Sequence, residues 1–186
     1  SSSILDKIRI SSFNVISILS GTGYVTDDFS LWGNFSLIFF ILLMFIGGCA
    51  GSTACGIKIF RFQMLFLFLI NQIKKLIYPN SINIIKYNNQ KISDNFINSV
   101  IIFIFSFLFI FFFISLLLSL TGLDLLTSIS GAASAISNVG PGLGEIIGPN
   151  GNYKSIPDIS KWILCFGMLL GRLELFAVLV LFFPSF

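Results

Sequence analysis

The stretch that decides the fold is Ser137–Gly142, which reads Ser-Asn-Val-Gly-Pro-Gly, and a related stretch, Ser-Gly-Thr-Gly-Tyr, occupies Ser20–Tyr24. Each follows an amphipathic segment and precedes a long apolar one. Pro141 has no backbone N–H, so a helix that reaches it has to end there. Extended backbone at such a point can turn its carbonyl oxygens toward an ion, as in carbonyl-lined filters. We therefore predict that both stretches are pore loops.

The composition around these loops is that of a membrane protein. Hydrophobic residues make up 55% of the 186 residues and charged residues only 10%, against roughly 25% charged in an ordinary soluble domain. No charged residue lies between Asp94 and Asp124. The apolar run 100–120 would form a helix of about 31 Å at about 1.5 Å per residue, which matches a hydrocarbon core of about 30 Å. We predict an all-α integral membrane protein embedded in the lipid bilayer.

Several chemical functions are excluded by what the chain lacks. It has no His, which removes imidazole as a metal ligand or general base. Its three Cys are an odd number without zinc-type spacing, so we interpret them as packing residues. Gly51 stands where a phosphate-binding loop needs Lys, and an apolar segment precedes it instead of a strand. The net charge of +3 is spread over loops, so nothing indicates nucleic acid. We predict no enzyme; redox chemistry at Cys49 and Cys55 is the weaker alternative.

Two helices are too short to cross a bilayer and lead into the two pore loops. They are expected over Phe13–Leu19 and Thr127–Ile136, and segments of this length suit re-entrant helices. A buried turn between two helices is the alternative for the first of them. Gly142, Gly144 and Gly148 are expected to keep the second return loop irregular as far as Asp158.

A third irregular stretch, Gly47–Gly56, interrupts the apolar run that begins at Phe35 and resumes at Ile57. Each Gly costs about 1 kcal/mol relative to Ala inside a helix, so four of them in this stretch predict a broken helix. Within a membrane such a break is tolerated only where protein or a water-filled cavity satisfies the backbone. We expect this segment to lie beside a cavity.

The charges indicate the orientation. Lys74, Lys75, Lys86 and Lys91 gather in and before the polar link Tyr78–Asn98, which the positive-inside rule places in the cytoplasm. The return loop after the second pore loop is then extracellular. Lys154 and Lys161 in that region count against this orientation, and Glu145 and Asp158 offset them.

The last apolar segment, Trp162–Phe183, is long enough to span and carries Arg172 and Glu174 near its middle. A charge at the bilayer centre costs roughly 2.5 to 3.5 kcal/mol on insertion scales. Residues two apart do not share a helix face. Each of the two charges is therefore expected to find another partner.

One order of elements occurs twice, over 13–73 and 127–183: re-entrant helix, Gly-containing loop, spanning helix. We divide the chain into 1–77, a unit with pore helix, filter loop and broken second span; 78–99, a cytoplasmic link; and 100–186, a complete span, pore-helix and span unit. An internal repeat of this size decides the fold class. The first unit lacks its outer span, and the chain starts at Ser, so we expect that its true beginning is missing.

Several motifs in this order resemble the Trk/Ktr/HKT potassium-transporter superfamily, and most closely its bacterial TrkH branch, over essentially the whole chain. They are Thr22-Gly23-Tyr24 with Asp27, Asp28 and Trp32; Gly-Gly-Cys-Ala-Gly-Ser-Thr at 47–53 with Gly-Ile-Lys at 56–58; Asn-Val-Gly-Pro-Gly-Leu-Gly at 138–144; and Leu-Leu-Gly-Arg-Leu-Glu at 169–174.

The resemblance implies potassium uptake across the bacterial inner membrane through a pore of four repeats, each with one filter strand. This multi-pass chain resembles the last two repeats, so we expect either a fragment or a partner of a separate half; a non-conducting scaffold is the alternative. The resemblance also implies a homodimer, a cytoplasmic nucleotide-binding regulator of the TrkA type, and no covalent cofactor, with potassium as the transported ligand. The basic link is a candidate contact for that regulator.

The same resemblance assigns roles to particular residues. The filter carbonyls are expected from Gly21, Thr22, Gly23, Asn138, Val139 and Gly140. The gate is expected from Gly47, Gly48, Gly51, Ser52, Thr53, Gly56 and Arg172. The outer mouth is expected to be lined by Asp27, Asp28 and Glu145. Family members commonly have Gly-Gly where this chain has Ala54-Cys55, a departure that bears on the flexibility of the loop.

Overall fold

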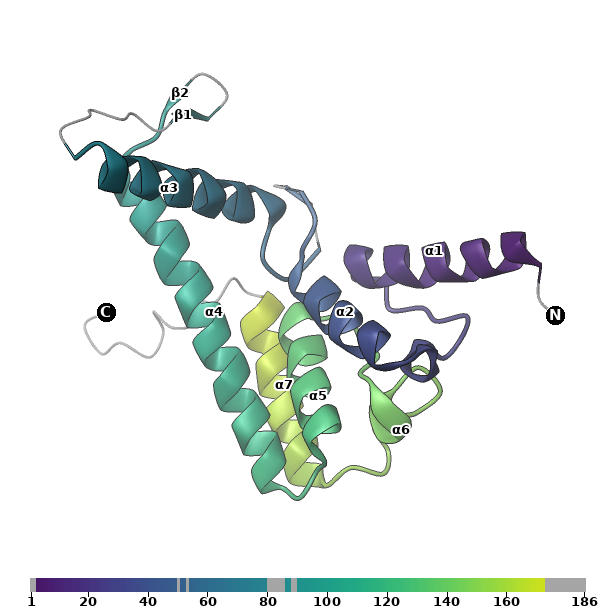
Figure 1. Cartoon of the computed structure of the whole chain (residues 1–186). Coiled ribbons are helices and arrows are strands. Elements are labelled where there is room, and N and C mark those ends of the chain that lie inside the picture. The colour runs from purple at the N-terminus through teal and green to yellow at the C-terminus, as the bar shows by residue number, and fades with distance from the viewer. Residues whose placement is uncertain (1–2, 50, 53, 80–85, 88–89, 173–186) are drawn as a thin grey trace.

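The computed structural model describes residues 3–49, 51–52, 54–79, 86–87 and 90–172. The regular elements among these residues are helices, apart from one two-stranded antiparallel hairpin, and loops connect them. In chain order the elements are α1 (Ile4–Ser20), the 3-10 helix η1 (Phe29–Trp32), α2 (Asn34–Phe45), α3 (Ile59–Ile77), β1 (Lys86–Tyr87), β2 (Gln90–Lys91), α4 (Asp94–Leu120), α5 (Leu125–Ser137), α6 (Gly144–Ile147) and α7 (Asp158–Arg172), as Figure 1 shows.

Helix α4 is the one described helix that is long and apolar enough to cross a membrane. It starts at Asp94, earlier than the expected Val100, because the Ser93 hydroxyl accepts a hydrogen bond from the Phe96 N–H at 3.3 Å and caps the helix. The last residues of the expected link therefore belong to this helix. One of its faces is buried and the other is exposed and apolar. That pattern suits a helix with protein on one side and lipid on the other.

The core lies where α4, α5 and α7 pack against one another (Figure 1). Most of α5 is buried, and its small side chains let the neighbouring helices approach closely. A Cβ on Gly167 of α7 would lie 3.0 Å from Ile114 Cδ1 and 3.4 Å from Ala135 Cβ. The expected short helix Thr127–Ile136 is thus present, with a few more residues at its ends, as a buried helix behind the second loop.

Helix α1 is longer than the expected Phe13–Leu19. The Ser3 hydroxyl accepts a hydrogen bond from the Leu5 N–H at 3.3 Å, and Asp6 forms an ion pair with Arg9 at 3.3 Å one turn later. A capped start and a charge pair at i,i+3 support a helix through residues too polar to continue the apolar pattern. The re-entrant segment is therefore the C-terminal half of a longer helix.

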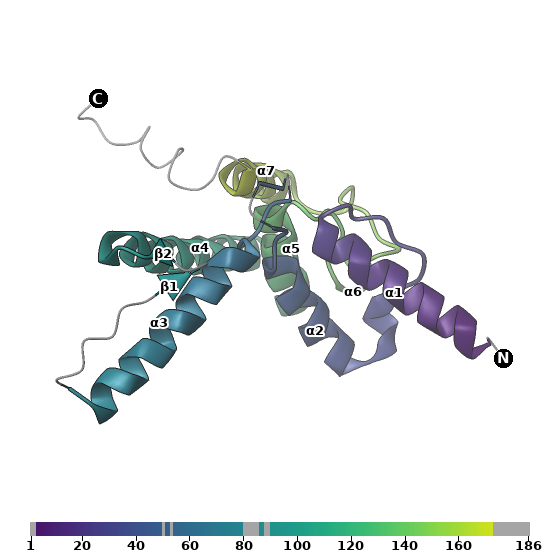
Figure 2. The same cartoon turned by 90° about the horizontal axis from the view of Figure 1, so that it is seen from above.

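Other departures from expectation are local. The return loop contains the one-turn helix α6, and η1 forms before α2. The polar link contains the β1–β2 hairpin, which pairs Lys86 with Lys91 and Tyr87 with Gln90. Helix α7 begins at Asp158, before the expected Trp162. The rest of that predicted span, including Glu174, lies outside the described residues. Figure 2 shows α3 running at a wide angle to α4.

Asp124 caps the N-terminus of α5 and gives a testable stability effect. Its carboxylate accepts a hydrogen bond from the Thr127 N–H at 3.1 Å. Partial burial opposes ionisation, but the hydrogen bonds from Thr127 and the nearby backbone outweigh it and lower the pKa of Asp124. Asp124→Ala should lower the free energy of unfolding by about 1 kcal/mol, measured by denaturant titration of the detergent-solubilised chain.

The pH dependence follows from the lowered pKa. The Asp124 contribution is fully present above the ordinary carboxyl pKa of 3.8 and is lost as the pH falls through the lowered value. Asp124→Asn keeps the capping oxygen, so it should retain most of the stability and lose this acid-dependent part. Asp6→Ala, which breaks only an exposed ion pair, is the control and should change stability little. Equal losses for the two Ala variants would contradict the capping role.

Candidate functional site

The first loop begins where α1 ends in a left-handed turn. Gly21 has φ +70° and donates its N–H to Ile18 O at 3.1 Å, and the Thr22 N–H follows with a bond to Ser17 O at 3.0 Å. Gly23 then also takes a positive φ, +75°. Positive φ is easily reached only without a Cβ, so both Gly are required for this turn of the chain.

The second loop follows the same backbone plan at the end of α5. Asn138, with φ +51°, is the only non-Gly residue with positive φ among the described residues, and Asn is one of the few side chains that tolerates this region. Its N–H bonds to Ala135 O at 3.1 Å, and the Val139 N–H bonds to Ser134 O at 3.1 Å. Gly140 follows with φ +114°.

The structure brings the two loops into direct contact. A Cβ built on Gly23 would overlap the carbonyl oxygen of Val139 and would lie 3.2 Å from Pro141 Cδ. Only Gly therefore allows the first loop to come this close to the second. Two segments far apart in the sequence thus place their predicted filter residues side by side.

Three hydroxyl groups form hydrogen bonds with the backbone of the two loops. None of the three was predicted from the sequence. Ser17 donates to Tyr24 O at 2.6 Å, while Ser134 accepts from the Gly140 N–H at 3.1 Å. The Tyr153 hydroxyl, from the loop before α7, donates to Gly140 O at 2.6 Å. Ser17 precedes Gly23 by the same number of residues as Ser134 precedes Gly140, and this repeated spacing is visible in the sequence. Tyr153 had no such signal.

The three predicted mouth residues lie in and beside η1 and α6. Asp27 accepts a bond from the Trp32 indole N–H at 3.1 Å. Asp28 accepts from the Ser30 N–H at 2.9 Å and from the Asn150 amide at 3.3 Å, so it also joins the outer segments of the two halves. Glu145 is exposed in the first turn of α6.

The Gly-rich stretch is a loop that closes on itself, as the predicted helix break requires. Its ends pair through a parallel bridge between Ile46 and Ile57, with the Gly47 N–H bonded to Ile57 O at 2.9 Å. A Cβ on Gly47 would overlap the Cys55 carbonyl oxygen. Gly51 and Gly56 have positive φ. Thr53, which was predicted for the gate, lies outside the described residues.

Two cations from outside the loop reach it. The Lys58 ammonium donates to Ser52 O, to the Ser52 hydroxyl at 3.3 Å and to Ala54 O at 3.0 Å. The Arg172 guanidinium lies 3.5 Å from the Cys55 sulfur. Both border a cavity of about 210 Å³ beside the loop, in agreement with the expectation that the break lies next to a cavity.

Helix α7 contacts both the second loop and the Gly-rich loop. The Asn138 amide donates to Met168 O at 3.0 Å, and Gly171 packs so closely that its Cβ would overlap Ile136 O. Arg172 is the next residue, at the Gly-rich loop. A displacement of the end of α7 would therefore change the contacts of the second loop and of the Gly-rich loop together.

The Lys58 contacts predict that this residue keeps the Gly-rich loop closed. Replacing it with Met removes a charged donor from Ser52 and Ala54, and because these contacts are exposed or half-buried their net contribution is about that of one ordinary hydrogen bond, up to about 1.5 kcal/mol. In a chain whose only Cys is the half-buried Cys55, the rate of maleimide labelling in detergent should rise by about 10-fold. A chain whose only Cys is Cys165, exposed on α7, is the control. An unchanged Cys55 rate would contradict the role of Lys58.

Comparisons with known proteins support the assignment of the family. The model of the TrkH family, described as "Cation transport protein", matches residues 3–185. The Trk system potassium uptake protein TrkI of Halomonas elongata is 50% identical over 175 residues, which cover 94% of this chain and 36% of that protein. TrkH of Escherichia coli K12 is 35% identical over 185 residues, 100% of this chain and 38% of its own length.

A solved structure agrees with the fold. The crystal structure of the potassium transporter TrkH from Vibrio parahaemolyticus superposes with a TM-score of 0.90 at 33% identity and covers 100% of this chain and 39% of that one. The chain therefore spans less than two fifths of the length of these relatives. The fold is that of an all-α membrane transporter, and such proteins are integral to the bacterial inner membrane and are not enzymes. The chain belongs to the TrkH family of cation transport proteins.

Proposed function

We propose that this chain forms part of a potassium uptake pore in which Gly21–Gly23 and Asn138–Gly140 each supply one strand of a carbonyl-lined filter. The observation that carries the proposal is that the two loops share one backbone plan and touch at Gly23 and Val139. The relatives named as potassium uptake proteins support the choice of ion. The cargo is therefore a dehydrated potassium ion.

The filter works by replacing the water shell of the ion with carbonyl oxygens. Helices α1 and α5 end at the two loops, and the C-terminus of a helix carries about half a negative charge. Both helices therefore favour a cation at the loops. Asp27, Asp28 and Glu145 would raise the local concentration of cations outside the filter.

Two filter strands do not enclose an ion, so the filter is completed by two further units. We assign 1–77 and 100–186 to repeats three and four of a ring of four, with 78–99 as the cytoplasmic link. The common plan of the two loops supports this assignment. In this proposal the two further units belong either to the same polypeptide or to a companion chain. A non-conducting scaffold is the alternative function for the chain by itself.

The gate of this pore is the Gly-rich loop held by Arg172. The guanidinium contacts Cys55, and a cation beside the ion path repels potassium at short range. In this proposal Gly47, Gly48, Gly51, Ser52, Thr53 and Gly56 supply the movable backbone. Opening moves the loop and Arg172 apart.

Two partners complete the assembly that we propose. A second copy makes a homodimer, and a nucleotide-binding regulator of the TrkA type docks on the cytoplasmic face. The exposed Lys74 and Lys75 at the end of α3, together with Lys86 and Lys91 of the hairpin, offer a basic contact for the regulator.

The experiment that tests the function is a chimera in which residues 3–185 replace the matching segment of the Halomonas elongata TrkI. It is expressed in bacteria that lack their own potassium uptake systems, and rubidium uptake is measured alongside growth at low potassium. We expect the chimera to restore both, with the parent TrkI as the positive control. A chimera that reaches the membrane at normal levels but carries no rubidium would favour the scaffold.

A further inference from the structure

We propose that Tyr153 is a positioning residue for the filter, and that it acts together with Ser134 to set how strongly the second filter strand prefers potassium over sodium. The inference rests on the proposed function and adds a determinant of specificity to it. The observation behind it is that both backbone polar groups of Gly140 are held by side chains from different parts of the chain.

Ser134 fixes the direction of the Val139 carbonyl. Its hydroxyl accepts the Gly140 N–H at 3.1 Å, and this N–H belongs to the same peptide plane as Val139 O. In a trans peptide the N–H and the C=O point to opposite sides. Holding the N–H toward α5 therefore aims Val139 O away from α5, on the side where Gly23 approaches it.

Tyr153 holds the next peptide plane. Its hydroxyl donates to Gly140 O at 2.6 Å, a short bond for two oxygen atoms. Gly140 has φ +114°, and no heavy atom lies within 4 Å of the position its Cβ would take. Close packing therefore does not restrain this residue from that side. The Tyr153 and Ser134 hydroxyls do the restraining.

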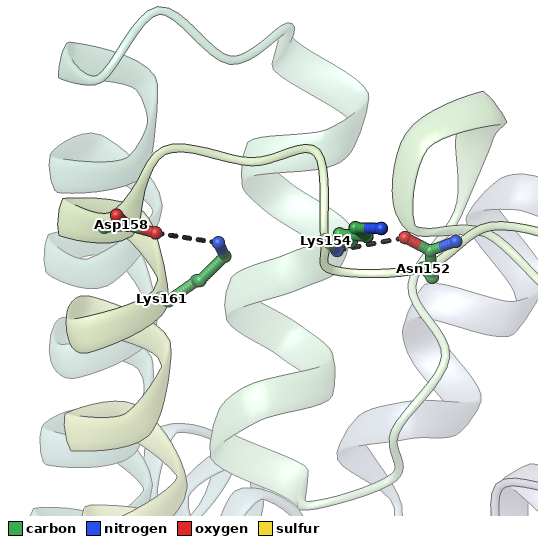
Figure 3. Close-up of polar contacts among 4 residues, drawn as sticks. All are labelled: Asn152, Lys154, Asp158 and Lys161. Atoms are coloured by element: carbon green, nitrogen blue, oxygen red, sulfur yellow. Dashed lines mark hydrogen bonds and ion pairs between the residues drawn. The ribbon is translucent and has the colours of Figure 1, made fainter.

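The loop that carries Tyr153 is itself anchored on both sides. Before it, the Asn152 N–H bonds to Ile146 O at 3.0 Å, and the Asn152 side chain accepts the Lys154 N–H at 3.0 Å. After it, the Ser160 hydroxyl donates to the Thr121 hydroxyl at 2.8 Å and joins the first turn of α7 to the end of α4, while the Asp158–Lys161 ion pair at 2.8 Å lies within that turn. Figure 3 shows the Asn152 and Asp158 contacts. The tyrosine thus links a fixed outer loop to the filter.

The Tyr153 hydroxyl stays protonated at neutral pH and so remains a donor, and there is open space beside the Gly140 carbonyl that it holds. Burial raises the pKa of Tyr153 above its usual 10, although a hydrogen bond with Ser134 opposes this. Tyr153 and Gly140 both border a cavity of about 400 Å³. Without the hydroxyl, the Gly140 carbonyl faces this space and the peptide is free to turn. Gly140 is then held by Ser134 alone, so the Val139 carbonyl is less firmly fixed.

The test is Tyr153→Phe in the chimera with TrkI, with the ratio of apparent affinities for rubidium and sodium measured by competition. One net hydrogen bond of ordinary strength corresponds to about a 2- to 10-fold change, so we expect the ratio to fall by that factor while maximal rubidium uptake stays near normal. Ser134→Ala, which releases the other side of Gly140, should change the ratio in the same direction.

Tyr87→Phe is the matched control. It removes a hydroxyl that donates to Gln63 at 3.2 Å and lies in the β1–β2 hairpin, outside both loops, so the ratio should not change. A Tyr153→Phe ratio equal to that of the unmutated chimera would overturn the inference. If the unmutated chimera itself carries no rubidium, the proposed function fails instead, and the two failures are distinct.

Discussion

Replacing Arg172 with Ala is expected to raise rubidium flux through the chimera by about 10- to 100-fold at low driving force. The guanidinium lies 3.5 Å from the Cys55 sulfur of the Gly-rich loop. A thiol is a weak acceptor, so this contact contributes at the low end of the ordinary range, about 0.5 kcal/mol, and the repulsion of potassium by the Arg172 charge adds the larger part. Losing that contribution shifts a two-state gate toward its open form. The measurement is rubidium uptake per transporter in the membrane.

Two further variants separate gating from a general effect of charge. Arg172→Lys keeps the positive charge and loses the planar fork of donors, so its flux should lie between those of the chimera and of Arg172→Ala. Arg9→Ala removes a guanidinium from an exposed ion pair on α1 and should leave flux unchanged. Normal or reduced flux in a folded Arg172→Ala transporter would contradict the role of this residue in closing the pore.

Gly23→Ala is expected to lower potassium transport by about 10- to 100-fold, since the new Cβ overlaps the Val139 carbonyl oxygen and overpacking costs about 1 to 3 kcal/mol. To accommodate it, the two filter strands have to separate. Because the wider filter holds a dehydrated ion less well, the remaining flux should also discriminate less between rubidium and sodium.

The control for Gly23→Ala is Gly122→Ala, after α4. Gly122 has a similar φ, +87°, but no heavy atom lies near the position of its Cβ. The backbone strain is therefore comparable and the overlap with the filter is absent. Gly140→Ser should mainly weaken selectivity, because its φ of +114° is strained for Ser but its Cβ meets no neighbour. Equal transport by the Gly23 and Gly122 variants would contradict the close contact of the loops.

The positions of most helices could be predicted from the apolar runs and from the Gly and Pro residues that interrupt them. The helix break at Gly47–Gly56 and the short helix before Ser137 follow from Gly content and length, and both are present. The bounds were wrong where polar residues continue a helix. Ser3 and Ser93 extend α1 and α4 by capping, and an apolar pattern does not contain that information.

Contacts between distant segments could not be predicted in the same way. Tyr153 is one of four Tyr in the chain, and only the fold shows that its hydroxyl reaches Gly140. In the sequence Lys58 is only the last residue of the Gly-Ile-Lys motif at 56–58, whereas the structure places its ammonium on the loop carbonyls. Residues that hold backbone from a distance leave no local pattern.

The central claim is that the two loops bind the transported ion together, and locating rubidium in crystals of the chimera tests it most directly. Anomalous scattering distinguishes rubidium from water and sodium. We expect rubidium between the carbonyl oxygens of the first loop, at Thr22 and Gly23, and the carbonyl oxygen of Val139 in the second. An active transporter in which rubidium occupies a site that neither loop touches would contradict the claim.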